Sequence, residues 1–82
     1  MPPTLPVLLG RLIVERRTAL NLSQRRLGYL VDVDTQVISS WETGRRLPTL
    51  PNFLALAHHL GLDLGDLSVL LQDGDNGGAA AA

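Results

Sequence analysis

Prolines and glycines divide this chain into short segments, and in none of them do apolar and polar residues alternate as they do in a strand. Apolar residues recur instead at spacings of three and four, which is typical of amphipathic helices. A chain of 82 residues has room for one domain with a modest core. The sequence therefore predicts an all-α domain of five short helices over residues 1–71, followed by a disordered tail at residues 72–82.

Residues suited to capping mark where each helix should begin and end. The expected N-caps are Thr4, Ser23, Asp34, Thr49 and Asp63, and an acidic residue three positions after the last of them is similar to a capping-box acid. Turn residues follow the first four helices: Asn21, Asp32, Gly44 and Gly61. The helices are expected at about residues 6–20, 23–31, 35–42, 49–60 and 63–71.

Apolar stripes indicate the residues expected to face the core. In the most regular stripe, the fourth helix carries Leu50, Phe53, Leu54, Ala57 and Leu60 at helical spacing. The stripes of the other helices are Leu9, Ile13, Ala19 and Leu20; Leu27, Leu30 and Val31; Ile38 and Trp41; and Leu64 and Leu67. One core shared by all five helices would bury these side chains.

Charge is distributed unevenly along the chain, although the formal net charge is only -1. All seven basic residues are arginines between Arg11 and Arg46, where four acidic residues leave a net +3, while residues 47–82 hold four aspartates and no basic residue. Only the first half is therefore suited to an anionic partner such as nucleic acid. The alternative at this point is that the arginines only solvate helix surfaces.

Other functional classes find no support in the sequence. The absence of cysteine excludes disulfides and Cys-based zinc sites. His58 and His59 are about 100° apart on a helix and cannot face one metal, and the C-terminal aspartates lack calcium-loop spacing. No apolar run is long enough to span a membrane, and none has the form of a signal peptide. We therefore expect a cytoplasmic protein that is not an enzyme and uses no metal, cofactor or membrane.

The segment at about residues 23–43 carries the most specific signal. Two helices of about eight residues are joined there by Asp32, Val33 and Asp34, and so short a turn does not allow antiparallel packing. The helices must cross at a steep angle, which is helix-turn-helix geometry. In that motif the second helix presents its N-terminal side chains to base edges in the major groove of DNA.

These residues resemble the phage-repressor type of helix-turn-helix, the Xre or lambda-repressor-like domains. The matching positions are Ser23-Gln24, Leu27, Ile38-Ser39, Trp41-Glu42, Gly44, Arg45, Pro48 and the helix from Leu50 to Gly61. The resemblance runs from about Leu9 to Leu67, and its matches are spread over four helices at fixed spacing. It implies a double-stranded DNA-binding domain of a bacterial or phage regulator, associated with the nucleoid.

The resemblance also implies which residues read bases. Thr35, Gln36, Ser39 and Ser40 fall where the family's recognition helix meets base edges. The amide of Gln36 can pair bidentately with adenine N6 and N7, and Val37 or the Thr35 methyl can pack on a thymine methyl. For Ser39 and Ser40 the alternative is a solvated helix surface.

Contacts to DNA phosphates are implied in the same way for Gln24, Arg25, Arg45 and Arg46, with Arg11 and Arg26 as further candidates. The resemblance also implies that Gln24 braces the recognition helix. The alternative is that Gln24 simply occupies the first position of its helix, and single arginines can be solvated. Arg17 and Glu42 match an arginine and a glutamate that form a structural ion pair across the core of related domains. Removing one partner of a buried pair would leave a desolvated charge and destabilise the fold.

Three residues depart from the family pattern. Gly28 replaces the usual alanine and is expected to loosen its helix by up to about 1 kcal/mol. Asp32 stands where glycine commonly adopts a left-handed conformation, which aspartate tolerates better than most residues. Asp34 precedes the recognition helix with a negative charge that favours the helix dipole but repels a nearby phosphate. We expect modest DNA affinity per monomer.

The function implied is a sequence-specific transcriptional regulator, most readily a repressor, that acts as a homodimer on a palindromic operator. A minimal repressor, a restriction-modification controller and an antitoxin all fit a chain of this kind, and the sequence does not choose between them. A single small module buries too little surface for tight binding, whereas two recognition helices about 34 Å apart can read a palindrome. A helix at about residues 63–71 is the expected dimer surface, because Val69, Leu70 and Leu71 exceed what the core can bury. The alternative for these three residues is that they complete the core.

The rival hypothesis is a protein-interaction module or antitoxin on the same scaffold, with DNA binding secondary or lost. Its partner would be a toxin or another protein. The acidic second half of the chain and the aspartates beside the recognition helix favour it. The adjacent Arg45 and Arg46, and Gln36 in the reading position, favour DNA.

Overall fold

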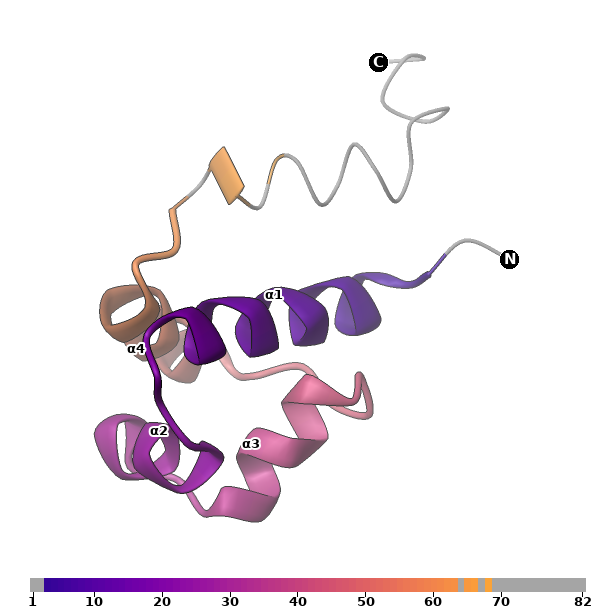
Figure 1. The fold of residues 1–82 in the computed structure, drawn as a ribbon. Helices are drawn as coiled ribbons and strands as arrows, with labels where there is room; N and C mark the ends of the chain where they lie inside the picture. Colours follow the sequence, from indigo (N-terminus) through magenta and orange to yellow (C-terminus); the bar gives the residue numbers. More distant parts are fainter. Residues whose placement is uncertain (1–2, 64, 67, 69–82) are drawn as a thin grey trace, which may run out of the picture.

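The computed structural model describes residues 3–63, 65–66 and 68. In this part of the chain the secondary structure is helical, with no strand. The helices are α1 (Leu5–Ala19), α2 (Gln24–Val31), α3 (Thr35–Glu42) and α4 (Leu50–Leu60) (Figure 1). Their bounds lie within one residue of those expected, and the all-α prediction is confirmed. No helix among the described residues has both the length and the apolar character to cross a membrane.

The number of helices differs from the prediction. Four helices are formed by the described residues, where the apolar pattern predicts five. Gly65, Asp66 and Ser68 of the expected fifth helix are helical, but its other positions and the tail at residues 72–82 lie outside the described residues. The prediction of five helices is therefore corrected to four for the described part of the chain.

Side-chain caps begin several of these helices as their residue types predict. The hydroxyl of Ser23 accepts a hydrogen bond from the backbone N–H three residues later at 2.9 Å, and that of Thr49 does the same at 3.4 Å. Asp63 and Asp66 form a reciprocal box in which each carboxylate accepts from the other residue's N–H, at 2.9 and 3.0 Å. Thr4 occupies the cap of α1 without a side-chain hydrogen bond.

All four helices end in the same way. The backbone turns at a residue with positive φ: Asn21 (58°), Asp32 (61°), Gly44 (79°) and Gly61 (72°). The N–H of the following residue then donates to the carbonyl five residues before it, at 2.9 to 3.0 Å in each case. This is the Schellman motif, which pairs the last carbonyls of a helix. Asparagine and aspartate end α1 and α2, because their short polar side chains tolerate the left-handed region that glycine enters freely.

The four helices enclose one core. It consists of Leu9, Ile13, Leu27, Val31, Ile38, Trp41, Leu56, Leu60 and Leu62. Figure 1 shows α3 beside α2 and below α1, with α4 on the far side. The backbones of α1 and α3 approach each other closely at Gly10, where an added Cβ would lie 2.5 Å from the carbonyl oxygens of both Trp41 and Glu42. A glycine is required there for the backbone of α1 to meet the end of α3.

The stripe expected on α4 is partly wrong. Leu50 and Leu54 are 69% and 59% exposed, whereas Leu56, which is outside that stripe, is fully buried beside Leu60. Seven of the eleven residues of this helix are leucine, alanine or phenylalanine, so more than one set of positions has helical spacing and periodicity cannot choose between them. Leu20, expected to face the core from the end of the first helix, is also 46% exposed.

Candidate nucleic-acid interface

The first turn of α3 presents polar side chains to solvent. Thr35 and Gln36 are both exposed, while Ile38 and Trp41 on the opposite side of the helix are buried in the core. Val37 is half-buried between the two sides. The core contacts of α3 therefore fix which side chains it offers outward, and the two strongest base-reading candidates are among them.

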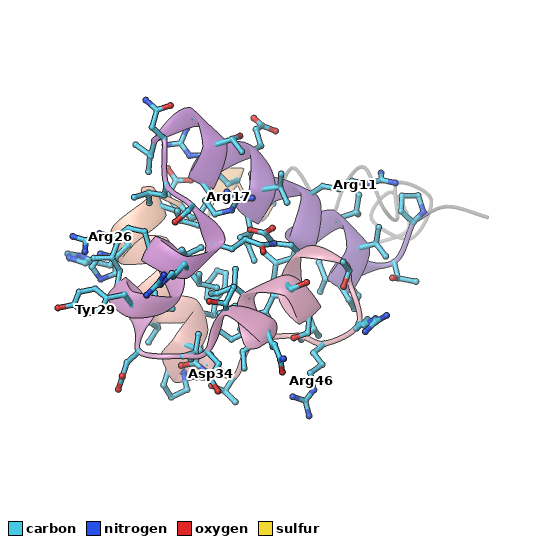
Figure 2. All side chains as sticks on the ribbon, turned by 60° about the horizontal axis from the view of Figure 1, so that its bottom comes forward. Arg11, Arg17, Arg26, Tyr29, Asp34 and Arg46 are labelled. Carbon is cyan, nitrogen blue, oxygen red and sulfur yellow. The ribbon has the colours of Figure 1, made fainter. Side chains whose placement is uncertain are left out.

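A hollow lies between α3 and the loop that follows it. Gln36, Val37, Ser39 and Ser40 line its helix side, and Arg45 and Arg46 line its loop side. Figure 2 shows Arg46 projecting on the same side of the molecule as Asp34, at the start of α3. The structure thus brings three of the four base-reading candidates together with two phosphate candidates, while Thr35 lies at the first residue of α3 outside the hollow.

Backbone hydrogen bonds hold the basic loop against α3. The N–H groups of Arg45 and Arg46 donate to the carbonyl of Ser40 at 3.0 and 3.2 Å. The Ser40 hydroxyl donates to the carbonyl of Val37 at 2.7 Å, so its hydrogen is committed within the helix and only its lone pairs can face a base. The backbones of both arginines are therefore held in place relative to α3.

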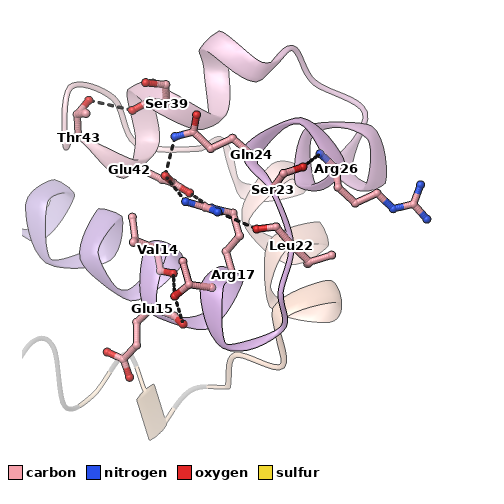
Figure 3. Close-up of polar contacts among 11 residues, drawn as sticks. Val14, Glu15, Arg17, Leu22, Ser23, Gln24, Arg26, Ser39, Glu42 and Thr43 are labelled. Carbon is pink, nitrogen blue, oxygen red and sulfur yellow. Dashed lines mark hydrogen bonds and ion pairs between the residues drawn. The ribbon is translucent and has the colours of Figure 1, made fainter.

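Arg17 and Glu42 form the expected ion pair. The Nε of Arg17 donates to Oε2 of Glu42 at 2.6 Å and its Nη2 to Oε1 at 3.3 Å, with the two side chains only 14% and 5% exposed (Figure 3). The Nη1 of Arg17 also donates to the carbonyl of Leu22 at 2.7 Å. One guanidinium therefore joins α1, the turn before α2 and the end of α3.

Gln24 completes this cluster, and sequence reasoning predicts that it braces the recognition helix without identifying Glu42 as its partner. Its Nε2 donates to Oε1 of Glu42 at 2.8 Å, across the gap between α2 and α3 (Figure 3). An amide nitrogen carries two hydrogens, so one remains for another acceptor such as a phosphate. The half-buried Gln24 thus braces the two helices of the motif through a glutamate, a partner that no local spacing in the sequence indicates.

The other arginines take different positions. Arg25 is exposed on α2, and Arg26 places its guanidinium 5.1 Å from the ring centre of Tyr29. Arg16 donates through Nε to the carbonyl of Leu60 at 3.1 Å and so ties α1 to the end of α4. Arg11 is exposed on α1, well apart from Arg26 and Arg46 in Figure 2. The two further phosphate candidates, Arg11 and Arg26, do not line the hollow beside α3.

Similarity to known proteins agrees with this geometry. A sequence model of the helix-turn-helix family matches residues 13–67. The chain belongs to the Xre or lambda-repressor-like helix-turn-helix family. DNA binding and transcription regulation are the functional class of this family.

Solved structures of other proteins share the fold. The restriction-modification controller protein C.AhdI from Aeromonas hydrophila is 35% identical over 76% of this chain and 94% of its own, with a TM-score of 0.68. Two structures of the clp gene regulator ClgR from Corynebacterium glutamicum are 22% identical, with TM-scores of 0.77 and 0.79. They cover 90% and 99% of this chain, and 95% and 86% of their own. No curated protein sequence matches the chain.

Two departures from the family pattern lie at the turn of the motif. Asp32 adopts the left-handed conformation expected of it, with φ 61° and ψ 48°. Gly28 is buried, and a Cβ there would lie 2.7 Å from the carbonyl oxygen of Val33. Glycine at this position therefore does more than loosen α2. Because it has no side chain, the backbone of the turn can lie where the Cβ of the usual alanine would be.

Asp34 is the third departure. It is the N-cap residue of α3, but its carboxylate makes no hydrogen bond to the helix N–H groups and is exposed. Among the described residues its carboxylate therefore has no hydrogen-bond partner at the start of α3. The expected dimer residues Val69, Leu70 and Leu71 lie outside the described residues, so the structure does not bear on them.

Proposed function

We propose that this protein is a sequence-specific repressor of transcription that binds a palindromic operator as a homodimer. The observation that carries the proposal is the hollow beside α3, where Gln36 faces outward on one side and Arg45 and Arg46 line the other. Base-reading amides beside guanidinium groups are what a surface needs to contact base edges and the adjoining phosphates together.

Base reading is assigned to α3. Gln36 is exposed in its first turn and has both an acceptor and a donor for adenine. Thr35 offers a hydroxyl, and Ser39 and Ser40 are half-buried at the rim of the hollow with weaker readout. We therefore assign the main sequence preference to Gln36.

Phosphate binding is assigned to Gln24, Arg25, Arg45 and Arg46. Arg45 and Arg46 are exposed and fixed through their backbones to the end of α3. Gln24 donates one amide hydrogen to Glu42, and this bond holds its side chain in place at the start of α2. The second amide hydrogen is not used by Glu42 and can be donated to a phosphate. These contacts set the orientation of α3 in the groove without reading sequence.

The homodimer follows from the size of the module. One recognition helix of eight residues offers few base contacts, and single modules of this kind bury too little surface for tight binding. Two copies related by a two-fold axis place their helices about one turn of DNA, roughly 34 Å, apart. An operator with inverted half-sites then matches the symmetry of the protein.

Selection from a random double-stranded DNA pool at about 100 mM salt tests this function. The expected result is enrichment of an inverted repeat whose half-sites are centred about 10 base pairs apart. Reporter assays with that site upstream of a promoter would then show reduced transcription. If folded protein enriches no sequence, the proposal is wrong.

A second candidate function is binding of a protein partner, as in an antitoxin. The free carboxylate of Asp34 at the start of α3 favours it, because a negative charge there opposes DNA phosphates. Arg45 and Arg46 oppose it, since they place two positive charges on the same surface. Copurification of a partner that competes with DNA for this surface would support the second candidate.

A further inference from the structure

The outer face of α4 is apolar although it lies at the surface. None of the eleven residues of this helix is aspartate, glutamate, lysine or arginine. Its inner side buries Leu56 and Leu60 completely, yet Leu50 and Leu54 on the outer side are 69% and 59% exposed. Leu47, just before the helix, is 50% exposed. A helix that is apolar on both faces is normally covered on both.

We propose that Leu47, Leu50 and Leu54, here called the α4 patch, form the surface through which two copies of this chain pair about a two-fold axis. This inference rests on the proposed homodimeric function and names the surface that makes it possible. It differs from the expectation that residues 69–71 form the dimer contact.

The charge of the surface favours a second copy as the partner. A two-fold interface is made of the same patch on both subunits, so charged groups near the axis meet their own kind. The outer face of α4 has no acidic residue, lysine or arginine, so it pairs with itself without repulsion between such side chains. By contrast, self-pairing of the exposed face of α2 would bring Arg25 and Arg26 of one copy against those of the other.

The position of the patch also suits pairing on DNA. In a dimer bound to a palindrome the two-fold axis passes between the two reading surfaces, so the pairing surface must adjoin each of them. Leu47 directly follows Arg46, which lines the hollow beside α3. A second hollow, lined by Val37 and Trp41 of α3 and by Arg46, Leu47, Thr49 and Asn52, makes the surface continuous from α3 to the start of α4.

The size of the patch is adequate for the centre of an interface. Three leucines exposed to this degree leave on the order of 300 Å² of apolar surface per copy, against about 800 Å² per partner in a standard interface. The rest would come from neighbouring residues, among them Pro51 and His58, which are also exposed on α4. An apolar centre with a polar rim is typical of protein interfaces.

Single cysteines test the proposal directly, because the chain has none of its own. Leu47→Cys, Leu50→Cys and Leu54→Cys would each be oxidised mildly in the full-length protein, with Leu20→Cys as the control. Leu20 is 46% exposed and is the C-cap residue of α1, so it does not belong to the α4 patch. We expect at least one patch variant to form disulfide dimers at least about tenfold faster than the control, since residues near a two-fold axis meet their own copies. Equal rates at all four positions would overturn the proposal.

Disruption of the patch gives a second test. Leu54→Glu should raise the dimer dissociation constant at least about 100-fold in sedimentation experiments, because the carboxylate would enter the interface twice. The helical circular dichroism should stay that of the parent, since the side chain is exposed. Leu20→Glu should dimerise like the parent. If Leu54→Glu does so too while Leu70→Glu is monomeric, the pairing surface lies at residues 69–71 and the proposal is wrong.

DNA binding separates this inference from the function on which it rests. Leu54→Glu should bind an isolated half-site like the parent but lose the added affinity of the inverted repeat. A parent that pairs through the patch yet selects no DNA would contradict the repressor function alone. A parent that selects an inverted repeat while Leu54→Glu retains full affinity for it would contradict the pairing surface alone.

Discussion

Glu42 connects three parts of the molecule through one carboxylate. It accepts hydrogen bonds from Arg17 of α1 and from Gln24 of α2 while standing at the end of α3. Because both side chains are largely shielded from water, removing the carboxylate should cost more than breaking a surface ion pair. The same contact orients α3 relative to Gln24. Glu42, which we do not assign to DNA binding, therefore positions residues that we do assign to DNA.

Replacing Glu42 with glutamine should lower the free energy of unfolding by about 3 kcal/mol, because the guanidinium of Arg17 would lose its charge partner while still desolvated. Urea denaturation followed by circular dichroism measures this. The matched control is Glu15→Gln, an exposed glutamate on α1, which should change the value by less than about 0.5 kcal/mol. Similar small effects at both positions would show that the pair contributes little.

Gln36→Ala should weaken binding to the selected operator by about 1 to 3 kcal/mol and abolish discrimination at one base position. Its exposure means that the fold should be unaffected. Titration of operators that differ at single base pairs measures both quantities. Arg46→Ala serves as the comparison, because loss of a phosphate contact should weaken all sequences alike. If Gln36→Ala bound the operator as tightly as the parent, Gln36 would not be a base-reading residue.

At the scale of elements, the turn between α2 and α3 is the tightest part of the motif. The N–H of Val33 donates to the carbonyl of Gly28 at 2.9 Å, and the carbonyl of Val33 occupies the space beside Gly28 where a side chain would stand. Asp32 turns the chain between them in the left-handed region. The crossing of the two helices therefore depends on a backbone contact as well as on core side chains.

Gly28→Ala should accordingly destabilise the protein by about 1 to 2 kcal/mol, even though alanine favours an isolated helix by roughly 1 kcal/mol. The cause is the collision of the new Cβ with the Val33 carbonyl, which forces the turn to shift. Thermal and urea unfolding measure the change. Arg25→Ala, an exposed substitution in the same helix, should stay within about 0.5 kcal/mol of the parent. A stabilised Gly28 variant would mean that the turn adapts freely.

At the scale of the whole molecule, charge is separated between two surfaces. Arg45 and Arg46 adjoin α3, whereas α4 has no acidic residue, lysine or arginine, and the two described aspartates after it, Asp63 and Asp66, bond to each other's backbone. The net charge of -1 therefore conceals a basic surface beside α3 and a face of α4 without acidic residues, lysine or arginine, while aspartates after α4 supply negative charge. The first suits DNA, and the second suits another copy of the chain.

DNA binding and dimerisation should depend differently on salt concentration. If each copy places Arg25, Arg45 and Arg46 on phosphates, a dimer makes six such contacts and should lose about a thousandfold in DNA affinity between 50 and 200 mM salt. Dimerisation through the uncharged α4 patch should change little over the same range. Fluorescence anisotropy and sedimentation measure the two responses. Salt-insensitive association with the target would point to a protein partner instead.

Much of this molecule follows from local sequence. Ser23 and Thr49 cap helices as their side chains allow, and Asp32 takes the left-handed turn, because capping and backbone preference depend on a few neighbouring residues. The bounds of α1 to α4 follow for the same reason. The pairing of Arg17 with Glu42 could be predicted from the family resemblance, although they are 25 positions apart in the chain.

The tertiary structure decided what local patterns leave open. The apolar sequence of α4 allows more than one inner face, and only packing against the other helices buried Leu56 and exposed Leu54. The bond from Gln24 to Glu42 and the requirement for glycine at Gly10 arise where separate helices meet. Spacing within one segment specifies helices and their ends, but which surfaces remain free depends on contacts between segments far apart in the chain.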